Sequence, residues 1–364
     1  MFYSRYGDTG MDVSALGFGG MRFEKENDID LSAEMLLHAY RRGINYFDTA
    51  PSYCSSKSEV IFGAAIREMK KGDRPFYIST KSNKPKGSDL RRDLENSLKI
   101  MGLESIDFYH CWYVLTLEDW DGRKKGGAVA EILKAQEEGL IKVPVFSTHL
   151  PGNEIRTVIE EGYFRGVTLG YSAINSPYRE DGIKAAAENN MGVVVMNPLG
   201  GGTIVENEET FGFLKVKSGQ SILEGALHFL MLDNRINVRL VGFRNKNDID
   251  TAVDAIESFQ PYTEEEVALI SSHVESDFNS LCTTCMYCNV CPVDIPVWKF
   301  VETANGLYLN PTEKLGDRLK WHWGTHIDVL DRCTECRMCE DACTQHLPIL
   351  QRFEELKEHL KTEV

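Results

Sequence analysis

The sequence predicts a (β/α)8 barrel followed by a small, helix-rich domain that carries most of the cysteines. Two observations support this prediction. Short apolar runs alternate with amphipathic stretches up to about residue 275, and eight of the ten cysteines then fall between Cys282 and Cys343. Apolar runs separated by helical periodicity are typical of βα units and a parallel sheet. We therefore expect two domains, at residues 1–275 and 276–364.

Eight apolar runs are the candidate strands. They lie near Val13–Gly17, Ile44–Asp48, Phe76–Lys81, Ile106–Trp112, Ile141–Ser147, Gly166–Ser172, Gly192–Asn197 and Val238–Val241. The candidate helices that follow them are Leu31–Arg42, Ser58–Lys70, Asp89–Met101, Gly126–Glu138, Glu154–Glu161, Arg179–Asn190, Ser221–Leu232 and Asp248–Ser258. Eight such units predict a closed barrel. An open doubly wound sheet is the alternative, although no G-x-G-x-x-G follows the first strand.

The opening stretch holds Gly7 and Gly10 between short apolar pieces, which predicts a hairpin that plugs the barrel floor. The net charge is −15, from 40 Lys and Arg against 55 Asp and Glu. An acidic chain repels phosphate backbones, so nucleic acid is not an expected partner. The chain has no apolar run of about 18 residues and no apolar core of a signal peptide near its start. We therefore expect a cytoplasmic protein without membrane association.

The cysteines of the second domain form two groups, and in each group the first three cysteines stand at every third residue. The first group is Cys282, Cys285, Cys288 and Cys291, and the second is Cys333, Cys336, Cys339 and Cys343. Three cysteines at every third residue wrap one compact cluster, and the fourth cysteine reaches a second cluster. The spacing predicts two 4Fe–4S clusters with crossed ligation. Cys282, Cys285, Cys288 and Cys343 would hold one cluster, and Cys333, Cys336, Cys339 and Cys291 the other.

This module resembles a bacterial two-cluster ferredoxin, with two departures. Thr344 replaces the proline that usually follows the last cysteine, and about 40 residues separate the groups. A pair of structural zinc sites is the alternative, although zinc sites usually use two separated C-x2-C pairs. Disulfides are the poorest option for a chain without a signal peptide. We interpret Cys54 and Cys111 as free thiols, and His322 and His326 as solvated or capping side chains.

Polar motifs lie at the expected carboxyl ends of the barrel strands. They are Gly17-Phe-Gly19-Gly20-Met21, Asp48-Thr-Ala-Pro-Ser-Tyr53, Tyr77-Ile-Ser-Thr-Lys81 and Asn197-Pro198-Leu199. In this order, over roughly residues 1–275, they resemble the aldo-keto reductase family. The cysteine tail resembles that of the branch of this family with ferredoxin-type clusters. The resemblance implies an oxidoreductase with its active site at the carboxyl ends of the strands.

A tyrosine donates a proton to a carbonyl oxygen efficiently only when its pKa is lowered. A neighbouring lysine cation has this effect, and an aspartate holds the lysine in place. The resemblance implies these three roles for Tyr53, Lys81 and Asp48.

The family usually adds a histidine at the end of the fourth strand, and Trp112 stands at that position. His110, two residues earlier on the same strand face and one layer deeper, is either a substitute or, as we favour, a buried hydrogen-bonded residue. His149, after the fifth strand, is a second candidate substitute. The steroid 5β-reductases of the family carry a glutamate at the histidine position and reduce an activated C=C bond. A conjugated enone is therefore a candidate substrate beside a simple carbonyl compound.

The resemblance also implies a nicotinamide dinucleotide lying across the barrel mouth. The expected contacts are Gly20, Met21, Ser147, Thr148, Tyr171, Asn197, Pro198, Leu199, Gly200, Arg244, Asn245 and Lys246. The cations Arg244 and Lys246 favour a ribose 2′-phosphate, and hence NADPH over NADH. Tyr171 stands where the family often has a glutamine that binds the carboxamide.

Three functions remain open at this point. The first is an NADPH-dependent oxidoreductase that acts on a small-molecule carbonyl or enone. The second is an electron-transfer or partner-docking protein whose barrel no longer transfers hydride. The third is an enzyme whose clusters deliver single electrons to a substrate in the barrel. A hydride carries two electrons, whereas a 4Fe–4S cluster passes one at a time, so the clusters are either structural or serve a separate one-electron step, for which a one-electron redox partner is a candidate.

Overall fold

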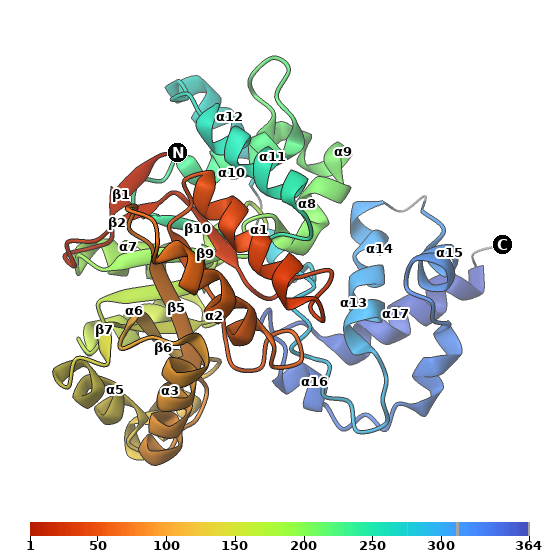
Figure 1. Cartoon of the computed structure of the whole chain (residues 1–364). Helices are drawn as coiled ribbons and strands as arrows, with labels where there is room; N and C mark the ends of the chain where they lie inside the picture. The colour runs from red at the N-terminus through yellow and green to blue at the C-terminus, as the bar shows by residue number, and fades with distance from the viewer. Residues whose placement is uncertain (275, 311–312, 363–364) are drawn as a thin grey trace. The chain divides into compact units, whose positions relative to one another are not determined.

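The computed structural model describes residues 1–274, 276–310 and 313–362, and the chain divides into two compact units (Figure 1). The barrel unit comprises Met1–Ser172, Tyr178–Pro198 and Leu223–Thr263. The tail unit comprises Ala173–Pro177, Leu199–Ile222 and Glu264–Val364. The boundary between domains 1–275 and 276–364 stays a prediction.

Eight parallel strands close the barrel in the order β10-β3-β4-β5-β6-β7-β8-β9. They are β3 (Leu16–Gly19), β4 (Tyr46–Asp48), β5 (Tyr77–Ser82), β6 (Ile106–Val114), β7 (Ile141–Thr148), β8 (Gly166–Gly170), β9 (Gly192–Met196) and β10 (Val238–Gly242). Every neighbouring pair is parallel. The predicted (β/α)8 barrel is confirmed, and the open sheet is wrong.

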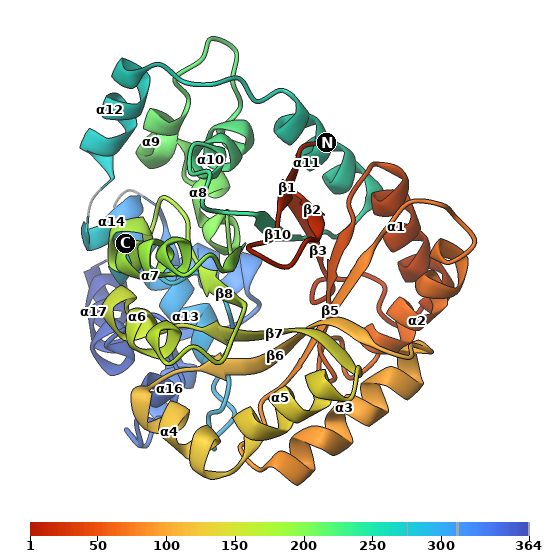
Figure 2. The ribbon, with the colours of Figure 1, turned by 90° about the vertical axis from the view of Figure 1, so that its left-hand side faces the viewer.

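Helices follow the strands and lie outside them, as Figure 2 shows for α1, α2, α3 and α5. They are α1 (Ile29–Arg41), α2 (Ser58–Met69), α3 (Gly87–Met101), α5 (Ala128–Glu137), α6 (Gly152–Glu160), α7 (Ser176–Glu188), α10 (Ile222–Met231) and α11 (Lys246–Glu257). Helix α3 illustrates why they form: Leu90, Leu94 and Leu98 recur every four residues and are all buried. Gly102 ends the helix in the left-handed conformation.

One helix of the barrel unit lies outside the predicted set. Helix α4 (Leu117–Lys125) follows β6 and buries only Trp120 and Arg123. Its remaining residues are mostly charged, so it has no apolar stripe from which periodicity could have predicted it.

The opening hairpin is present, but the predicted strand Val13–Gly17 is divided. Strand β1 (Tyr3–Arg5) pairs antiparallel with β2 (Asp12–Ser14), and the barrel strand β3 begins only at Leu16. The chain turns between them, where the Ser14 hydroxyl donates to the Leu16 carbonyl oxygen at 2.7 Å. Tyr6 and Val13 are fully buried in one cluster with interior strand residues such as Phe108. The hairpin therefore packs against the barrel interior.

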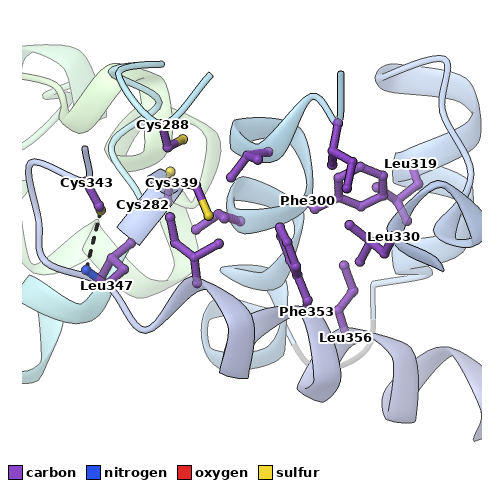
Figure 3. Close-up of a cluster of buried hydrophobic side chains, with 14 of the residues drawn as sticks. Cys282, Cys288, Phe300, Leu319, Leu330, Cys339, Cys343, Leu347, Phe353 and Leu356 are labelled. Carbon is purple, nitrogen blue, oxygen red and sulfur yellow. Dashed lines mark hydrogen bonds between the residues drawn. The ribbon is translucent and has the colours of Figure 1, made fainter. Parts of the chain in front are cut away.

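The tail unit consists of short helices and turns. Its helices are α8 (Thr203–Glu206), α9 (Glu208–Phe211), α12 (Glu264–His273), α13 (Val297–Ala304), α14 (Gly306–Leu309), α15 (Leu315–Asp317), α16 (Met338–Asp341) and α17 (Ile349–Thr362). Phe300 and Phe353 pack with ring centroids 6.1 Å apart, in a buried cluster that also contains Cys282 and Cys288 (Figure 3). In the part of the chain that the structure describes, no helix has the length and apolar character needed to cross a membrane.

Candidate functional site

Asp48, Lys81 and Tyr53 meet at the carboxyl ends of β4 and β5. Asp48 ends β4, Tyr53 lies in the loop that follows, and Lys81 lies near the end of β5. The Lys81 ammonium donates to Asp48 Oδ2 at 2.6 Å and to the Tyr53 hydroxyl oxygen at 3.3 Å. Asp48 and Lys81 are only 2% and 4% exposed. Water screens this ion pair little, so it holds the ammonium firmly beside the phenol.

Trp112 lies against this group from β6. Its ring centroid is 5.8 Å from that of Tyr53, with the rings nearly perpendicular. The Lys81 ammonium is 5.0 Å from the Tyr53 ring centroid and 5.9 Å from that of Trp112. The register of β6 shifts between Cys111 and Val114, and Tyr113 adopts a positive φ of 42° there. Such irregularities redirect side chains beside active sites, and here the indole becomes one wall of the site.

His110 lies one layer deeper and contacts the acid–base group through a serine. In the strand register His110 pairs with Lys81, and the imidazole is fully buried. His110 Nε2 is 2.8 Å from Ser79 Oγ, and that hydroxyl donates to Asp48 Oδ1 at 2.7 Å. Burial holds the pKa of His110 well below its ordinary value, and the Lys81 cation lowers it further. Sequence reasoning missed Ser79, although its position two residues before Lys81 places it on the same face of β5.

His149, the second candidate substitute, is also buried. Its backbone N–H donates to the Val114 carbonyl oxygen, and its carbonyl oxygen accepts from the Arg179 guanidinium at 2.9 Å. These bonds position the backbone at the end of β7.

The residues expected at the nicotinamide lie at the end of β7. The Ser147 hydroxyl accepts from the Tyr113 backbone N–H at 3.0 Å, whereas the Thr148 hydroxyl donates to the Val114 carbonyl oxygen at 2.9 Å. Among the described residues, the Ser147 hydroxyl therefore accepts one hydrogen bond, while the hydrogen of the Thr148 hydroxyl is used within the barrel.

The loop after β10 presents two cations at the start of α11. Asn245 caps the helix by accepting from the Asp248 N–H. The Arg244 side chain is 76% exposed, with Nε 3.4 Å from Asp248. The Lys246 ammonium is 3.3 Å from Glu34. A helix N-terminus beside two exposed cations suits a phosphate group, so this donor set fits the expected 2′-phosphate.

The other expected cofactor contacts are Gly20, Met21, Tyr171, Asn197, Pro198, Leu199 and Gly200. The Gly20 N–H donates to the Asp48 carbonyl oxygen at 2.8 Å, and Met21 next to it is half-buried. The Tyr171 hydroxyl donates to Glu180 at 3.0 Å. Asn197 and Pro198 belong to the barrel unit, whereas Leu199 and Gly200 belong to the tail unit.

Four of the cysteines surround one small cavity. Cys291, Cys333, Cys336 and Cys339 line it together with apolar residues such as Ile295. This set is the one that the crossed scheme assigns to a single cluster, because Cys291 comes from the first sequence group. The cavity therefore fits the donor set expected for that cluster.

The remaining four cysteines also lie near one another. Burial raises the pKa of Cys282 well above its ordinary value, and the nearby Cys285, Cys288 and Cys343 raise it further. Three of the four are buried in the cluster that Figure 3 shows, where the Leu347 N–H donates to Cys343 Sγ at 3.4 Å. In iron–sulfur proteins, hydrogen bonds to the cysteine sulfurs help to set the reduction potential.

One further contact and one absence bear on the metal assignment. The Thr344 hydroxyl, which replaces the usual proline, lies 3.1 Å from Cys285 Sγ. Across the described ranges, no three His, Cys, Asp or Glu side chains are arranged as ligands of a metal ion.

A closed (β/α)8 barrel that brings together a buried Asp48–Lys81 pair and the half-buried Tyr53 at its carboxyl face is the arrangement expected of a barrel oxidoreductase. Comparison with known proteins agrees: residues 15–275 match the Aldo/keto reductase family. The chain belongs to this family and is an oxidoreductase.

Individual relatives are distant. L-Galactose dehydrogenase of Arabidopsis thaliana is 26% identical over 285 residues, which cover 69% of this chain and 86% of the relative. NADH-specific methylglyoxal reductase of Escherichia coli is 25% identical over 53% of this chain and 66% of its own length. An aldo-keto reductase of Bacillus halodurans in its holo form superposes with a TM-score of 0.66 at 21% identity, covering 76% of this chain and 97% of that chain. This last likeness concerns the fold alone.

Proposed function

We propose that the protein is an NADPH-dependent reductase of a carbonyl compound or a conjugated enone, and that residues 276–364 hold two 4Fe–4S clusters. The observation that supports the reductase most strongly is the Lys81 ammonium, placed between Asp48 Oδ2 at 2.6 Å and the Tyr53 hydroxyl at 3.3 Å. In this proposal the protein acts in the cytoplasm on a small molecule.

The chemistry of the site follows from these three side chains. The nicotinamide supplies the hydride when it is bound. The Tyr53 hydroxyl donates its proton to the substrate oxygen, and the Lys81 ammonium stabilises the phenolate that remains. Asp48 is buried and accepts from Lys81, so it holds the ammonium directed at Tyr53.

Trp112 shapes the substrate class. Its indole can donate one hydrogen bond but cannot act as an acid or a base near neutral pH. The nearly perpendicular rings of Trp112 and Tyr53 offer an aromatic wall beside the proton donor. This wall suits a flat, conjugated substrate, which stacks on the indole, better than a small aliphatic aldehyde.

The proposal that the protein uses NADPH rather than NADH rests on two cations at the start of α11. Arg244 and Lys246 are exposed there and can pair with a 2′-phosphate. The Escherichia coli relative is named as NADH-specific, so affinity has to be measured for both nucleotides.

For the clusters, Cys282, Cys285, Cys288 and Cys343 would hold one, and Cys291, Cys333, Cys336 and Cys339 the other. The shared cavity of the second set supports this proposal. The described residues contain no ligand set for a single metal ion, and the proposal does not require one. A four-iron cluster is larger than one ion, so its cysteine ligands surround a volume and do not converge on one point. Bound clusters supply one-electron transfer. Cys336 is exposed, whereas Cys282 and Cys288 are buried, which favours a one-electron partner at the second set.

Anaerobic purification followed by iron and sulfide analysis tests the clusters. About eight irons and eight sulfides per chain are expected. Stoichiometric zinc without sulfide would instead establish structural zinc. Because ligation is crossed, Cys291→Ser should damage the cluster of the second group and Cys343→Ser that of the first. Damage confined to each residue's own sequence group contradicts the scheme.

Titration of the anaerobic protein with NADPH then distinguishes between the candidate functions. Substrate-dependent NADPH consumption with unchanged cluster absorbance supports plain reduction beside structural clusters. Bleaching of the clusters supports redox coupling. Failure to bind either nucleotide supports the alternative, an electron-transfer or partner-docking protein.

A further inference from the structure

A buried hydrogen-bonded chain continues from the acid–base group into the barrel interior. Asp48 Oδ1 accepts from Ser79 Oγ at 2.7 Å, and Ser79 Oγ lies 2.8 Å from His110 Nε2. Ser79 and His110 are fully buried. Asp48, Ser79 and His110 lie on three successive strands of the barrel, β4, β5 and β6, so the sheet itself holds this chain together.

The direction of these bonds follows from the number of hydrogens available. A carboxylate only accepts, so the single hydroxyl hydrogen of Ser79 goes to Asp48. His110 Nε2 must then carry a hydrogen and donate it to Ser79. His110 Nδ1 is left with a lone pair, and it has no hydrogen-bond partner within the described residues.

The imidazole is therefore a neutral donor in one tautomer. A proton on Nδ1 would add a cation that is buried, unpaired and close to Lys81, which burial and Coulombic repulsion both oppose. His110 is also too deep to touch a substrate at the mouth. It cannot replace the usual histidine as a proton donor.

We infer that His110 is a positioning residue: through Ser79 it fixes the Asp48 carboxylate so that Oδ2 holds the Lys81 ammonium against Tyr53. The inference rests on the proposed function of that group. The terminal torsion of an aspartate is soft, so one oxygen must be held for the other to direct the lysine. Ser79 holds Oδ1, and His110 keeps the Ser79 hydroxyl oriented for this purpose.

Kinetics of four variants test this role. His110→Leu removes the donor, and Ser79→Ala removes the bridge. Each should lower kcat roughly tenfold, about the value of one buried hydrogen bond, with KM and nucleotide affinity nearly unchanged. His110→Gln carries an amide N–H at a reach similar to Nε2 and should restore most of kcat. The double variant His110→Leu, Ser79→Ala should be no slower than Ser79→Ala alone, because both changes break one chain.

Tyr109→Phe is the matched control. Tyr109 is the buried neighbour of His110 on the same strand and, with period-two alternation, faces the opposite side. Removal of its hydroxyl in Tyr109→Phe should leave kcat unchanged. A folded His110→Leu variant with full kcat would overturn the inference. A double variant whose loss of kcat is the product of the two single losses would also overturn it.

Nitrogen-15 NMR of the histidines gives a readout independent of turnover. Subtracting the His110→Gln spectrum should identify His110 as a neutral Nε2–H tautomer whose signal moves in Ser79→Ala. An imidazolium or an Nδ1–H tautomer at pH 7 would overturn the inference even if every variant is inactive. By contrast, a wild-type protein that turns over neither carbonyls nor enones counts against the proposed function. The tautomer of His110 can still be tested by NMR in that case.

Discussion

The Trp112 indole meets the Tyr53 phenol edge-on, with ring centroids 5.8 Å apart and planes at 86°. Trp112 thus lies directly beside Tyr53, and the Lys81 ammonium is near both rings. In the proposed function, substrate choice and proton transfer therefore depend on adjacent side chains, and substitutions can separate them.

Tyr53→Phe should abolish most turnover while leaving the fold intact. The change removes only the hydroxyl that Lys81 contacts at 3.3 Å. Loss of a general acid typically lowers the rate about 100- to 10,000-fold. Steady-state kinetics with the best available enone, and nucleotide binding as the control for folding, check this result. Full turnover in Tyr53→Phe would refute the assigned mechanism.

Trp112→His should raise activity on simple aldehydes. An imidazole at this position can hydrogen-bond the carbonyl oxygen, and the smaller ring widens the pocket. The expected result is a higher kcat/KM for a small aldehyde and a lower one for a flat conjugated substrate, measured in parallel. If the wild type already reduces small aldehydes well and Trp112→His weakens this activity, the account of Trp112 is wrong.

Arg244→Gln and Lys246→Gln should each weaken NADPH binding about tenfold, because each removes a charge-assisted contact to the 2′-phosphate. NADH affinity should change little, since that nucleotide lacks the phosphate. Fluorescence titration with both nucleotides measures the effect. Lys184→Gln, an exposed lysine on α7, is the control for the loss of one positive charge. Equal losses for NADPH and NADH would reject the assignment.

Gly201→Ala should destabilise the tail unit and reduce its iron content. Gly201 has a φ of +73°, and a Cβ there would lie 2.1 Å from the Thr283 carbonyl oxygen, next to Cys282. Urea unfolding should show a loss of a few kcal/mol, as is usual for strained backbone substitutions. Gly212→Ala is the matched control, because its added Cβ meets nothing within 4 Å. The same urea midpoint and iron content in both variants would contradict this prediction.

Acid should destabilise the fold through its buried histidines. Burial lowers the pKa of His110 and of His228 below the ordinary 6.5. Below pH 6.5 the unfolded chain therefore takes up protons that the folded chain does not. The free energy of unfolding falls as the pH drops, by at most about 1.4 kcal/mol per pH unit for each histidine. Urea midpoints at pH 7.5 and 5.5 measure this loss, and His110→Gln should show a smaller one. An equal loss in that variant would contradict the prediction.

Alternation of apolar runs and amphipathic stretches was sufficient to predict the barrel. Each barrel strand and its following helix is a local unit, and its period is visible in about ten consecutive residues, as in Leu90, Leu94 and Leu98 of α3. Helix α4 was not predicted because it buries only Trp120 and Arg123. Two buried residues do not make an apolar stripe with a helical period. The same locality made Asp48, Tyr53 and Lys81 recognisable as strand-end motifs.

Contacts across the closed sheet were decided by tertiary structure. Ser79 and His110 are 31 residues apart and meet only because β5 and β6 pair in one particular register. Likewise, Thr203 donates to the Cys282 carbonyl oxygen 79 positions away, within the tail unit. Spacing along the chain shows which face of an element a side chain occupies. Which atoms then meet depends on strand register and on the path of the loops, and these are set by packing of the whole chain.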